Sequence, residues 1–253
     1  MTTNEQMNLC AAIANFAASC TTSQCRLVEL NGMLVLRRFG GRKIVINGGL
    51  CDIPVEGVSI AATSTQANNL YYVYAAVING ELVLEWSSVG HTQSEVTGIE
   101  IKLGDETRTL VGMVYVLQND AWPAAPELVA SWYNRQPIAK NSSTGAVSVS
   151  STSFQIVTTT ANSIGFLCWA DDAVSLSAAG YADCSNGSAA MVAIDGSPIG
   201  AYASGVQPQA SLAPTYAGLL TEGYHLAGIA MRSPNGGTSS GVIGFDMTVS
   251  GHP

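Results

Sequence analysis

From Arg26 onward, hydrophobic and polar positions follow the short period that is typical of β-strands. Asn-Gly or Asp-Gly pairs interrupt the pattern at residues 31–32, 79–80 and 195–196. These pairs favour the type I′ turn, because both of its central residues adopt positive φ. The runs that flank the three pairs are 27–30 with 33–36, 71–78 with 81–86, and 190–194 with 197–201. The sequence therefore predicts three β-hairpins.

Other runs of strand length predict further strands. They are Lys43–Ile46, Gly98–Leu103, Thr107–Leu117, Ile164–Trp169, His225–Met231 and Gly241–Val249. Short strands with many glycines and regular turns indicate a β-sandwich or a jelly roll.

The N-terminal residues follow a helical period instead. Thr3 and Gln6 fit the capping-box pattern, and Leu9, Ile13 and Phe16 then recur at helical spacing. We therefore expect a short amphipathic helix over residues 4–18, within an N-terminal segment 1–19. The stripe formed by Leu9, Ile13 and Phe16 either packs on its own domain or makes oligomer and docking contacts, since an apolar stripe alone does not say which surface covers it.

The length of 253 residues suggests two domains. Proline, polar and small residues gather at 137–145, where the charge balance also changes, so this segment is predicted to be the linker. The expected fold class is all-β with a short N-terminal helix. It comprises a β-sandwich attachment domain over 20–136 and a jelly-roll-like domain over 146–253, both antiparallel.

Charge is scarce and unevenly placed. Charged residues make up 11% of the chain, hydrophobic residues 47%, and the net charge is −8. Arg232 is the only Lys or Arg in residues 141–253, a stretch that contains six Asp or Glu. Such a chain lacks the cationic surface that nucleic acid requires, so we expect no nucleic-acid partner. The low charge also indicates large buried or partner-covered surfaces.

No apolar run reaches the length of a membrane span, so we expect no membrane partner. Residues 9–20 are apolar and rich in small residues, but Glu5 stands where a signal peptide carries Lys or Arg, so the segment is expected to be retained. Without an export signal the cysteines are expected to be reduced and buried. They are Cys10, Cys20, Cys25, Cys51, Cys168 and Cys184.

Three sequence patterns could indicate a catalytic or metal site, but the sequence context of each argues against such a site. Residues 237–241 match G-x-S-x-G, but they follow a turn and precede a strand, whereas a nucleophile elbow requires a strand before it and a helix after it. His91, His225 and His252 stand far apart and without ligand spacing, so hydrogen-bonded structural histidines are expected. Asp171-Asp172 is an adjacent acidic pair, for which a solvated loop or a cation contact is expected. We therefore predict no catalytic, cofactor or metal site.

Aromatic residues offer a carbohydrate platform as an alternative to core or subunit-interface packing. The candidates are Trp122, Trp132, Trp169, Tyr181 and Tyr216, with Trp169 and Tyr216 taken as the surface contacts.

Two strings in the first half carry a family resemblance. The run Gly104-Asp105-Glu106-Thr107-Arg108-Thr109-Leu110-Val111-Gly112 and the ending Ser131-Trp132-Tyr133-Asn134-Arg135 follow Tyr71-Tyr72-Val73-Tyr74, Leu84-Glu85 and His91. Over roughly residues 70–135 the chain resembles β-structured virion proteins of tailed bacteriophages, namely tail-fibre, head-fibre and capsid-decoration proteins. The second half is similar to trimeric jelly-roll heads of viral fibres in its glycine-rich tip and closing strand.

The resemblance implies a non-enzymatic virion structural protein. It would attach to major capsid or tail proteins by its N-terminal half and project a homotrimeric β domain, after assembly in the host cytoplasm. A trimer would cover apolar faces that a monomer exposes. Two alternatives remain open, a carbohydrate-binding module that recognises host-surface glycans and a glycan depolymerase.

Overall fold

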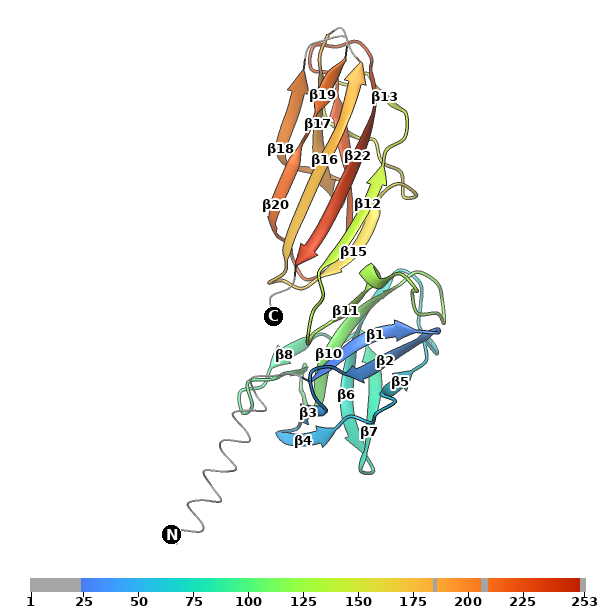
Figure 1. The fold of residues 1–253 in the computed structure, drawn as a ribbon, viewed down its shortest axis with the longest axis vertical. Coiled ribbons are helices and arrows are strands. Elements are labelled where there is room, and N and C mark those ends of the chain that lie inside the picture. Colours follow the sequence, from blue (N-terminus) through green and yellow to red (C-terminus); the bar gives the residue numbers. More distant parts are fainter. Residues whose placement is uncertain (1–23, 184–185, 206–208, 251–253) are drawn as a thin grey trace. The chain divides into compact units, whose positions relative to one another are not determined.

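The computed structural model describes residues 24–183, 186–205 and 209–250, and the chain divides after Arg135 into two compact units (Figure 1). We call residues up to Arg135 unit 1 and the residues from Gln136 unit 2. The predicted helix over 4–18, with Leu9, Ile13 and Phe16, lies outside the described residues. No helix in the described part of the chain is long and apolar enough to cross a membrane.

The described part of unit 1, residues 24–135, is built from antiparallel strands and one short 3-10 helix. The strands are β1 (Cys25–Leu30), β2 (Met33–Arg38), β3 (Lys43–Ile46), β4 (Gly49–Asp52), β5 (Val58–Ile60), β6 (Asn69–Ile78), β7 (Glu81–Ser87), β8 (His91–Gln93), β9 (Glu100–Lys102), β10 (Asp105–Val116) and β11 (Val129–Ser131), and the 3-10 helix η1 covers Pro126–Leu128. The main sheet of this described region has the order β7-β6-β10-β9-β8, with β11 also paired to β10.

The predicted hairpins of unit 1 are confirmed. Asn31 and Gly32 have φ of 53° and 80°, and Asn79 and Gly80 have φ of 54° and 84°. These values satisfy the type I′ requirement, so β1 pairs with β2 and β6 with β7 in the register that a two-residue turn imposes.

The core of unit 1 lies on one face of the main sheet. Leu27 and Leu34 of the β1-β2-β5 sheet and Ile44 of the β3-β4 hairpin pack in one cluster with Val73 and Val111 of the main sheet. The smaller sheets therefore form a second layer over this face, as expected for a sandwich.

Unit 2 is also antiparallel. Its strands are β12 (Ile138–Ser143), β13 (Val147–Val149), β14 (Gln155–Ile156), β15 (Ile164–Cys168), β16 (Ala173–Asp183), β17 (Ser188–Ile194), β18 (Ser197–Gly205), β19 (Ala210–Leu212), β20 (Thr215–Leu219), β21 (Gly223–Arg232) and β22 (Ser239–Ser250). The predicted hairpin at Asp195-Gly196 joins β17 to β18, and both turn residues have positive φ.

The longer strands of unit 2 follow the order of a jelly roll. One layer has the order β12-β22-β16-β20 and the other β15-β21-β17-β18. A single pair, Ala201 with Thr215, joins the two layers through β18 and β20. At the opposite side of the described strands, β12 and β14 end the strand path without pairing to each other, so the curled sheet is not closed.

Alternation along the strands places the core between the layers of unit 2. Val174 and Leu176 of β16, Phe245 of β22, and Val192 and Ile229 of the other layer belong to one buried cluster. Every second residue of β16 and β22 points outward instead.

The predicted linker at 137–145 is wrong. Residues 138–143 form β12, which pairs with β22 from Ile138–Val249 to Ser143–Gly244. Local composition missed this strand because its hydrogen-bonding partner lies about a hundred residues away in the sequence. The division of the chain instead falls between Arg135 and Gln136.

Candidate contact sites

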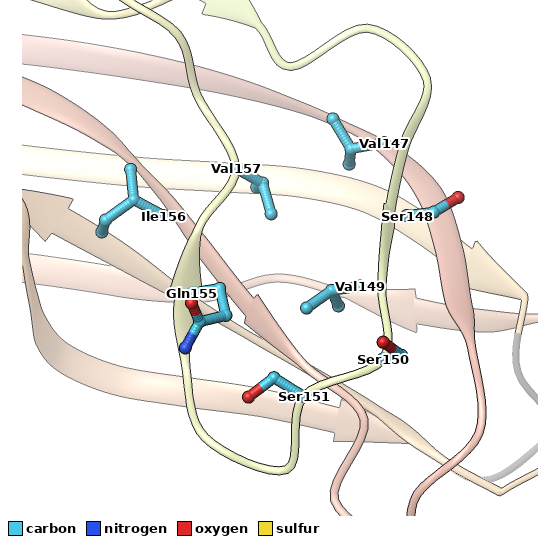
Figure 2. Close-up of a pocket in the computed structure, with 8 residues that line it drawn as sticks. All are labelled: Val147, Ser148, Val149, Ser150, Ser151, Gln155, Ile156 and Val157. Atoms are coloured by element: carbon cyan, nitrogen blue, oxygen red, sulfur yellow. The ribbon is translucent and has the colours of Figure 1, made fainter.

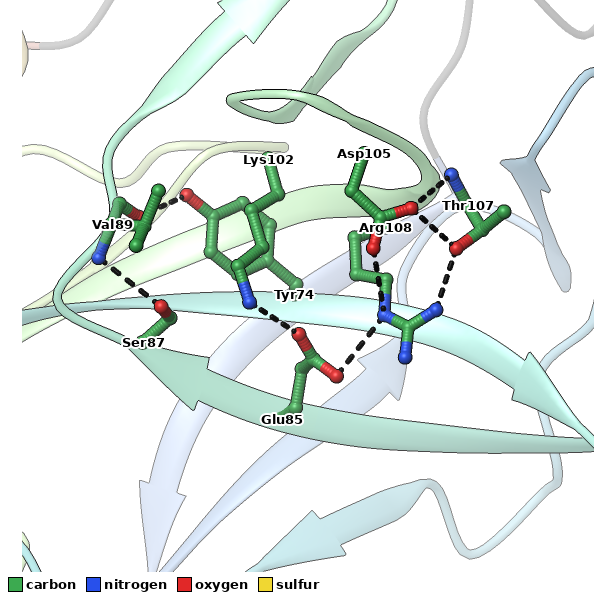
Figure 3. A network of polar contacts seen from close by, with 8 residues as sticks. All are labelled: Tyr74, Glu85, Ser87, Val89, Lys102, Asp105, Thr107 and Arg108. Atoms are coloured by element: carbon green, nitrogen blue, oxygen red, sulfur yellow. Dashed lines mark hydrogen bonds and ion pairs between the residues drawn. The ribbon is translucent and has the colours of Figure 1, made fainter.

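A charged network covers the face of the unit 1 main sheet that points away from the core (Figure 3). Glu85 of β7 accepts hydrogen bonds from Lys102 Nζ at 3.0 Å and from Arg108 Nε at 3.1 Å. The Tyr74 hydroxyl lies beside this network and donates to the Val89 carbonyl at 2.8 Å. The network ties β7 to β9 and β10, and it satisfies its half-buried charges internally.

The string that carried the family resemblance supplies part of this network. A hydrogen bond from the Thr107 side chain, followed by one from its backbone, lowers the pKa of the Asp105 carboxyl. Arg108 lies 3.5 Å from the same carboxylate. These residues therefore shape the β9–β10 hairpin.

The second string holds β1 in place. The Ser131 hydroxyl accepts a hydrogen bond from the Leu27 amide at 3.0 Å, and the Asn134 amide donates to the Cys25 carbonyl at 2.8 Å. Burial raises the pKa of the Cys25 thiol to about 12, so this cysteine is an inert structural residue. Both strings have architectural roles here.

A row of rings runs beside the charged network. The His91 ring lies 5.5 Å from the Tyr72 ring and 5.5 Å from the Trp132 ring, and the Arg135 guanidinium stacks 4.6 Å from the Trp132 ring. His91 Nδ1 contacts the Glu100 carboxylate at 2.6 Å. The prediction of a hydrogen-bonded structural histidine is confirmed for His91.

The second described histidine lies at one end of unit 2. His225 Nδ1 contacts Asp195 Oδ2 at 2.7 Å, and its Nε2 contacts the Thr221 carbonyl at 2.8 Å. Burial raises the pKa of the neighbouring Cys168 thiol to about 12, and the carboxylates of Asp172, Asp195 and Glu222 act in the same direction. A neutral, buried thiol is a poor nucleophile, so this Cys-His-Asp grouping lacks an activated cysteine.

The G-x-S-x-G string also fails as a nucleophile elbow. Its serine, Ser239, is fully buried at the start of β22, and its hydroxyl bonds the Ser188 hydroxyl at 2.5 Å. Strand β22 follows it, where an elbow requires a helix.

The predicted surface aromatics do not form a platform. Trp169 is 1% exposed, so its assignment as a surface contact is wrong. Its backbone amide donates to Asp172 Oδ2 at 2.8 Å, and the turn held by this bond keeps both residues buried. Tyr216 is half-buried against the core of unit 2, and its hydroxyl donates to the Leu219 carbonyl at 3.2 Å.

A cavity of about 480 Å³ lies at the open side of the curled sheet, between β13 and β14. Val149 and Val157 point toward one another across it, whereas Ser148 and Ile156 point away (Figure 2). The full lining is Val147, Ser148, Val149, Ser150, Ser151, Gln155, Ile156 and Val157. Hydroxyl and amide groups on a small apolar floor suit a neutral polar ligand.

An arginine with two aromatic neighbours lies at the end of β21. The Arg232 guanidinium carbon lies 4.7 Å from the centre of the Phe154 ring and 5.8 Å from that of Tyr202. The two rings are 6.5 Å apart, and Tyr202 is 57% exposed. Sequence reasoning missed this group, although the isolation of Arg232 as the only cation of its half was a signal.

The outer face of the β12-β22-β16-β20 layer is almost free of charge. It carries outward-pointing small residues, of which Ser175, Ser177 and Ala179 of β16 are exposed. Asp183 and Asp246 are the only charged residues at the outward positions of β16 and β22. We call this surface the small-residue face.

Comparison with known proteins adds little. No family model and no curated protein matches the chain. Two similar solved structures are BuGH86wt in complex with neoagarooctaose (8% identity, TM-score 0.22, 92% of this chain covered) and the exo-β-1,3-galactanase Pc1,3Gal43A from Phanerochaete chrysosporium with galactose (10% identity, TM-score 0.21, 90% covered). The chain spans 35% and 57% of the lengths of those proteins. Likeness at this level does not establish a shared fold.

Among the described residues, no His, Cys, Asp and Glu side chains gather in groups of three or more that could hold a metal ion. What the arrangement offers is contact surface, in the small-residue face, the cavity beside β14 and the aromatic group around Arg232.

Proposed function

We propose that this protein is a non-enzymatic structural protein of a tailed-phage virion, of the head-fibre, capsid-decoration or tail-fibre type. In this proposal its N-terminal half attaches to major capsid or tail proteins, and unit 2 projects as a homotrimer. The particle assembles in the host cytoplasm. The resemblance of residues 70–135 to such proteins motivates this role, and the jelly-roll order of unit 2 suits it.

The observation that carries the proposal is the small-residue face. Outward positions of β16 such as Ser175 and Ala179 are exposed and uncharged, so a second copy can approach without burying unpaired charge. An interface of this kind also accounts for a chain with 11% charged residues.

Light scattering on the purified full chain tests the assembly. We expect a trimer at micromolar concentration, and a Ser175→Arg variant that dissociates, because the new charge would be buried against a copy of itself. Ser175 has Thr248 and Ala217 as cross-strand neighbours, so no carboxylate stands directly opposite to neutralise the arginine. The matched control is Thr160→Arg, at an exposed position in the β14–β15 connection, which should remain trimeric. A wild-type monomer would count against the proposal.

The virion assignment requires a separate measurement. Mass spectrometry of purified phage particles should detect the chain, and antibody labelling in electron micrographs should place it on the head or the tail. Absence from particles that are produced while the chain is expressed would remove the assignment but leave the oligomer intact.

A second candidate function is a carbohydrate-binding module that recognises host-surface glycans. The observation that favours it is the pair of neighbouring rings Phe154 and Tyr202, which replaces the Trp169 and Tyr216 expected from sequence. Phe154 directly precedes Gln155, which lines the cavity. A glycan depolymerase is less well supported, because it needs two carboxylates facing one sugar, and Asp172 of the Asp171-Asp172 pair is buried and hydrogen-bonded to a backbone amide. A glycan array on the full chain tests binding, and release of reducing sugar from host polysaccharide tests cleavage.

A further inference from the structure

We propose that Arg232, Phe154 and Tyr202 form a recognition site for the carboxylate of an acidic saccharide. This inference rests on the second proposed function, which it deepens by naming the ligand class, and it is independent of the virion role.

The Arg232 guanidinium lacks an anionic partner among the described residues. Its side chain forms no hydrogen bond or ion pair with any of them, and its Nε is shielded from solvent without a hydrogen-bond acceptor. The chain offers six carboxylates in residues 141–253, and none of the described ion pairs involves Arg232. A partly desolvated guanidinium without an anion is unfavourable, so a ligand carboxylate would supply what the fold leaves out.

The Arg232 side chain is also held in place. Phe154 and Tyr202 stack near its guanidinium, and the β21 strand that carries it is paired on one edge with Ala189 of β17. A guanidinium held by two rings loses little conformational freedom when it binds a carboxylate through two parallel hydrogen bonds. Arg232 as a whole is half-buried, so the part of its guanidinium beyond the buried Nε forms the edge that a ligand would reach.

The Tyr202 ring offers a surface for the sugar ring of such a ligand. The Tyr202 ring is more than half exposed and offers an apolar surface on which a pyranose can stack. The loop that carries Phe154 also lines the cavity, and it is joined to the end of β21 by the hydrogen bond from the Ser233 amide to the Ser151 carbonyl at 2.8 Å. Gln155 lies opposite Met231, the residue next to Arg232. The loop therefore places the serine hydroxyls and the Gln155 amide of the cavity lining near the strand end that carries Arg232. These groups can form hydrogen bonds with the hydroxyls of a bound sugar.

The charge balance limits the class of ligand. A dense polyanion such as nucleic acid or a heavily sulfated glycan would meet one arginine among six carboxylates in this half of the chain. A saccharide with one carboxylate at the bound residue, such as a uronic or sialic acid unit, needs only one cation.

The experiment uses the full chain on an array that pairs acidic saccharides with neutral counterparts. Galacturonate and glucuronate oligomers are printed beside their methyl esters, and sialyllactose beside lactose. We expect binding to at least one acidic member, at least tenfold weaker binding to its neutral counterpart, and weakening as salt is raised. Arg232→Gln should weaken acidic binding at least tenfold, and Tyr202→Ala should weaken it as well. Lys140→Gln is the matched control, because it removes one positive charge from β12 of the same unit and should leave binding unchanged.

The outcomes separate this inference from the function on which it rests. Equal binding of acidic and neutral partners would overturn the carboxylate site and keep the carbohydrate-binding function. Binding that is unaffected by Arg232→Gln would do the same. Binding of no saccharide would overturn both. The comparison of acidic saccharides with their methyl esters uses only the wild-type chain. It therefore tests the proposal even if a variant fails to fold.

Discussion

His225 bridges two parts of unit 2, because its Nδ1 contacts the Asp195 carboxylate in the β17–β18 turn at 2.7 Å while its Nε2 contacts the Thr221 carbonyl before β21 at 2.8 Å. The same carboxylate accepts the Leu226 amide at 2.8 Å. This histidine therefore fastens a hairpin tip to the neighbouring strand.

Replacing His225 by Phe should lower the free energy of unfolding by about 1–3 kcal/mol, because the buried imidazole would no longer contact the Thr221 carbonyl and the Asp195 carboxylate. Urea denaturation followed by circular dichroism measures the change. Asp195→Asn is the matched comparison, since asparagine tolerates the φ of 50° and retains an acceptor for Leu226. An equal loss in both variants would show that the turn, rather than the histidine, carries the effect.

Replacing each of two glycines of β22 by alanine should change the stability of unit 2 by very different amounts. A Cβ at Gly241 would meet the Tyr181 carbonyl oxygen at 2.1 Å, whereas one at Gly244 would meet only ordinary contacts at 3.8 Å. We expect Gly241→Ala to destabilise unit 2 by about 1–3 kcal/mol or more, because the backbone of β16 must move, and Gly244→Ala to be nearly neutral. Thermal melting of the two variants compares them directly, and equal melting temperatures would contradict the close packing of β16 on β22.

Alkaline pH should destabilise the fold through its buried thiols. The pKa of Cys25 and that of Cys168 are raised to about 12 by burial, from the ordinary value of 9.0. A raised pKa means that the unfolded chain loses the proton first, so the stability contributed by the neutral thiol is complete below pH 9 and is lost between pH 9 and about 12. Denaturation midpoints measured from pH 8 to 11 should fall, and Cys25→Ala should flatten the slope. A slope that is unchanged in this variant would exclude Cys25 as a source.

Native-state alkylation should distinguish the described cysteines. Cys51 is partly exposed, whereas Cys25 and Cys168 are buried, and all three are free thiols. Iodoacetamide at pH 8 followed by peptide mapping should modify Cys51 well before the other two, because the reagent reaches the partly exposed thiol more easily. Equal labelling in denaturant is the control, and early labelling of Cys25 would indicate that β1 opens readily.

Replacing Glu85 should lower the free energy of unfolding only slightly, although Glu85 has two charged partners. Glu85→Gln removes a charge shared by Lys102 and Arg108, but all three side chains remain about a quarter exposed, so solvent screens the attraction. We expect a loss of about 1 kcal/mol or less that shrinks further in 0.5 M salt. A larger and salt-independent loss would mean that the network is effectively buried.

The hairpins could be predicted from the sequence because each depends on two adjacent turn residues. Asn31-Gly32, Asn79-Gly80 and Asp195-Gly196 each adopt the positive φ that their residue types favour. It missed β12 because that strand is polar on its exposed side and is stabilised by distant β22. It also missed the burial of Trp169, since a tryptophan at the end of a strand looks the same in sequence whether the following turn folds over it or away from it.

The sequence by itself determined that this chain is β-rich, where three of its hairpin turns lie, and that its second half is nearly without cations, because these properties follow from residue types and their spacing. Only the tertiary structure decided the jelly-roll order of unit 2, the burial of Ser239 and Trp169, and the contact of Arg232 with Phe154 and Tyr202. These three residues are dozens of positions apart in the chain. Long-range strand pairing brings them together, and no local pattern encodes which strands will pair.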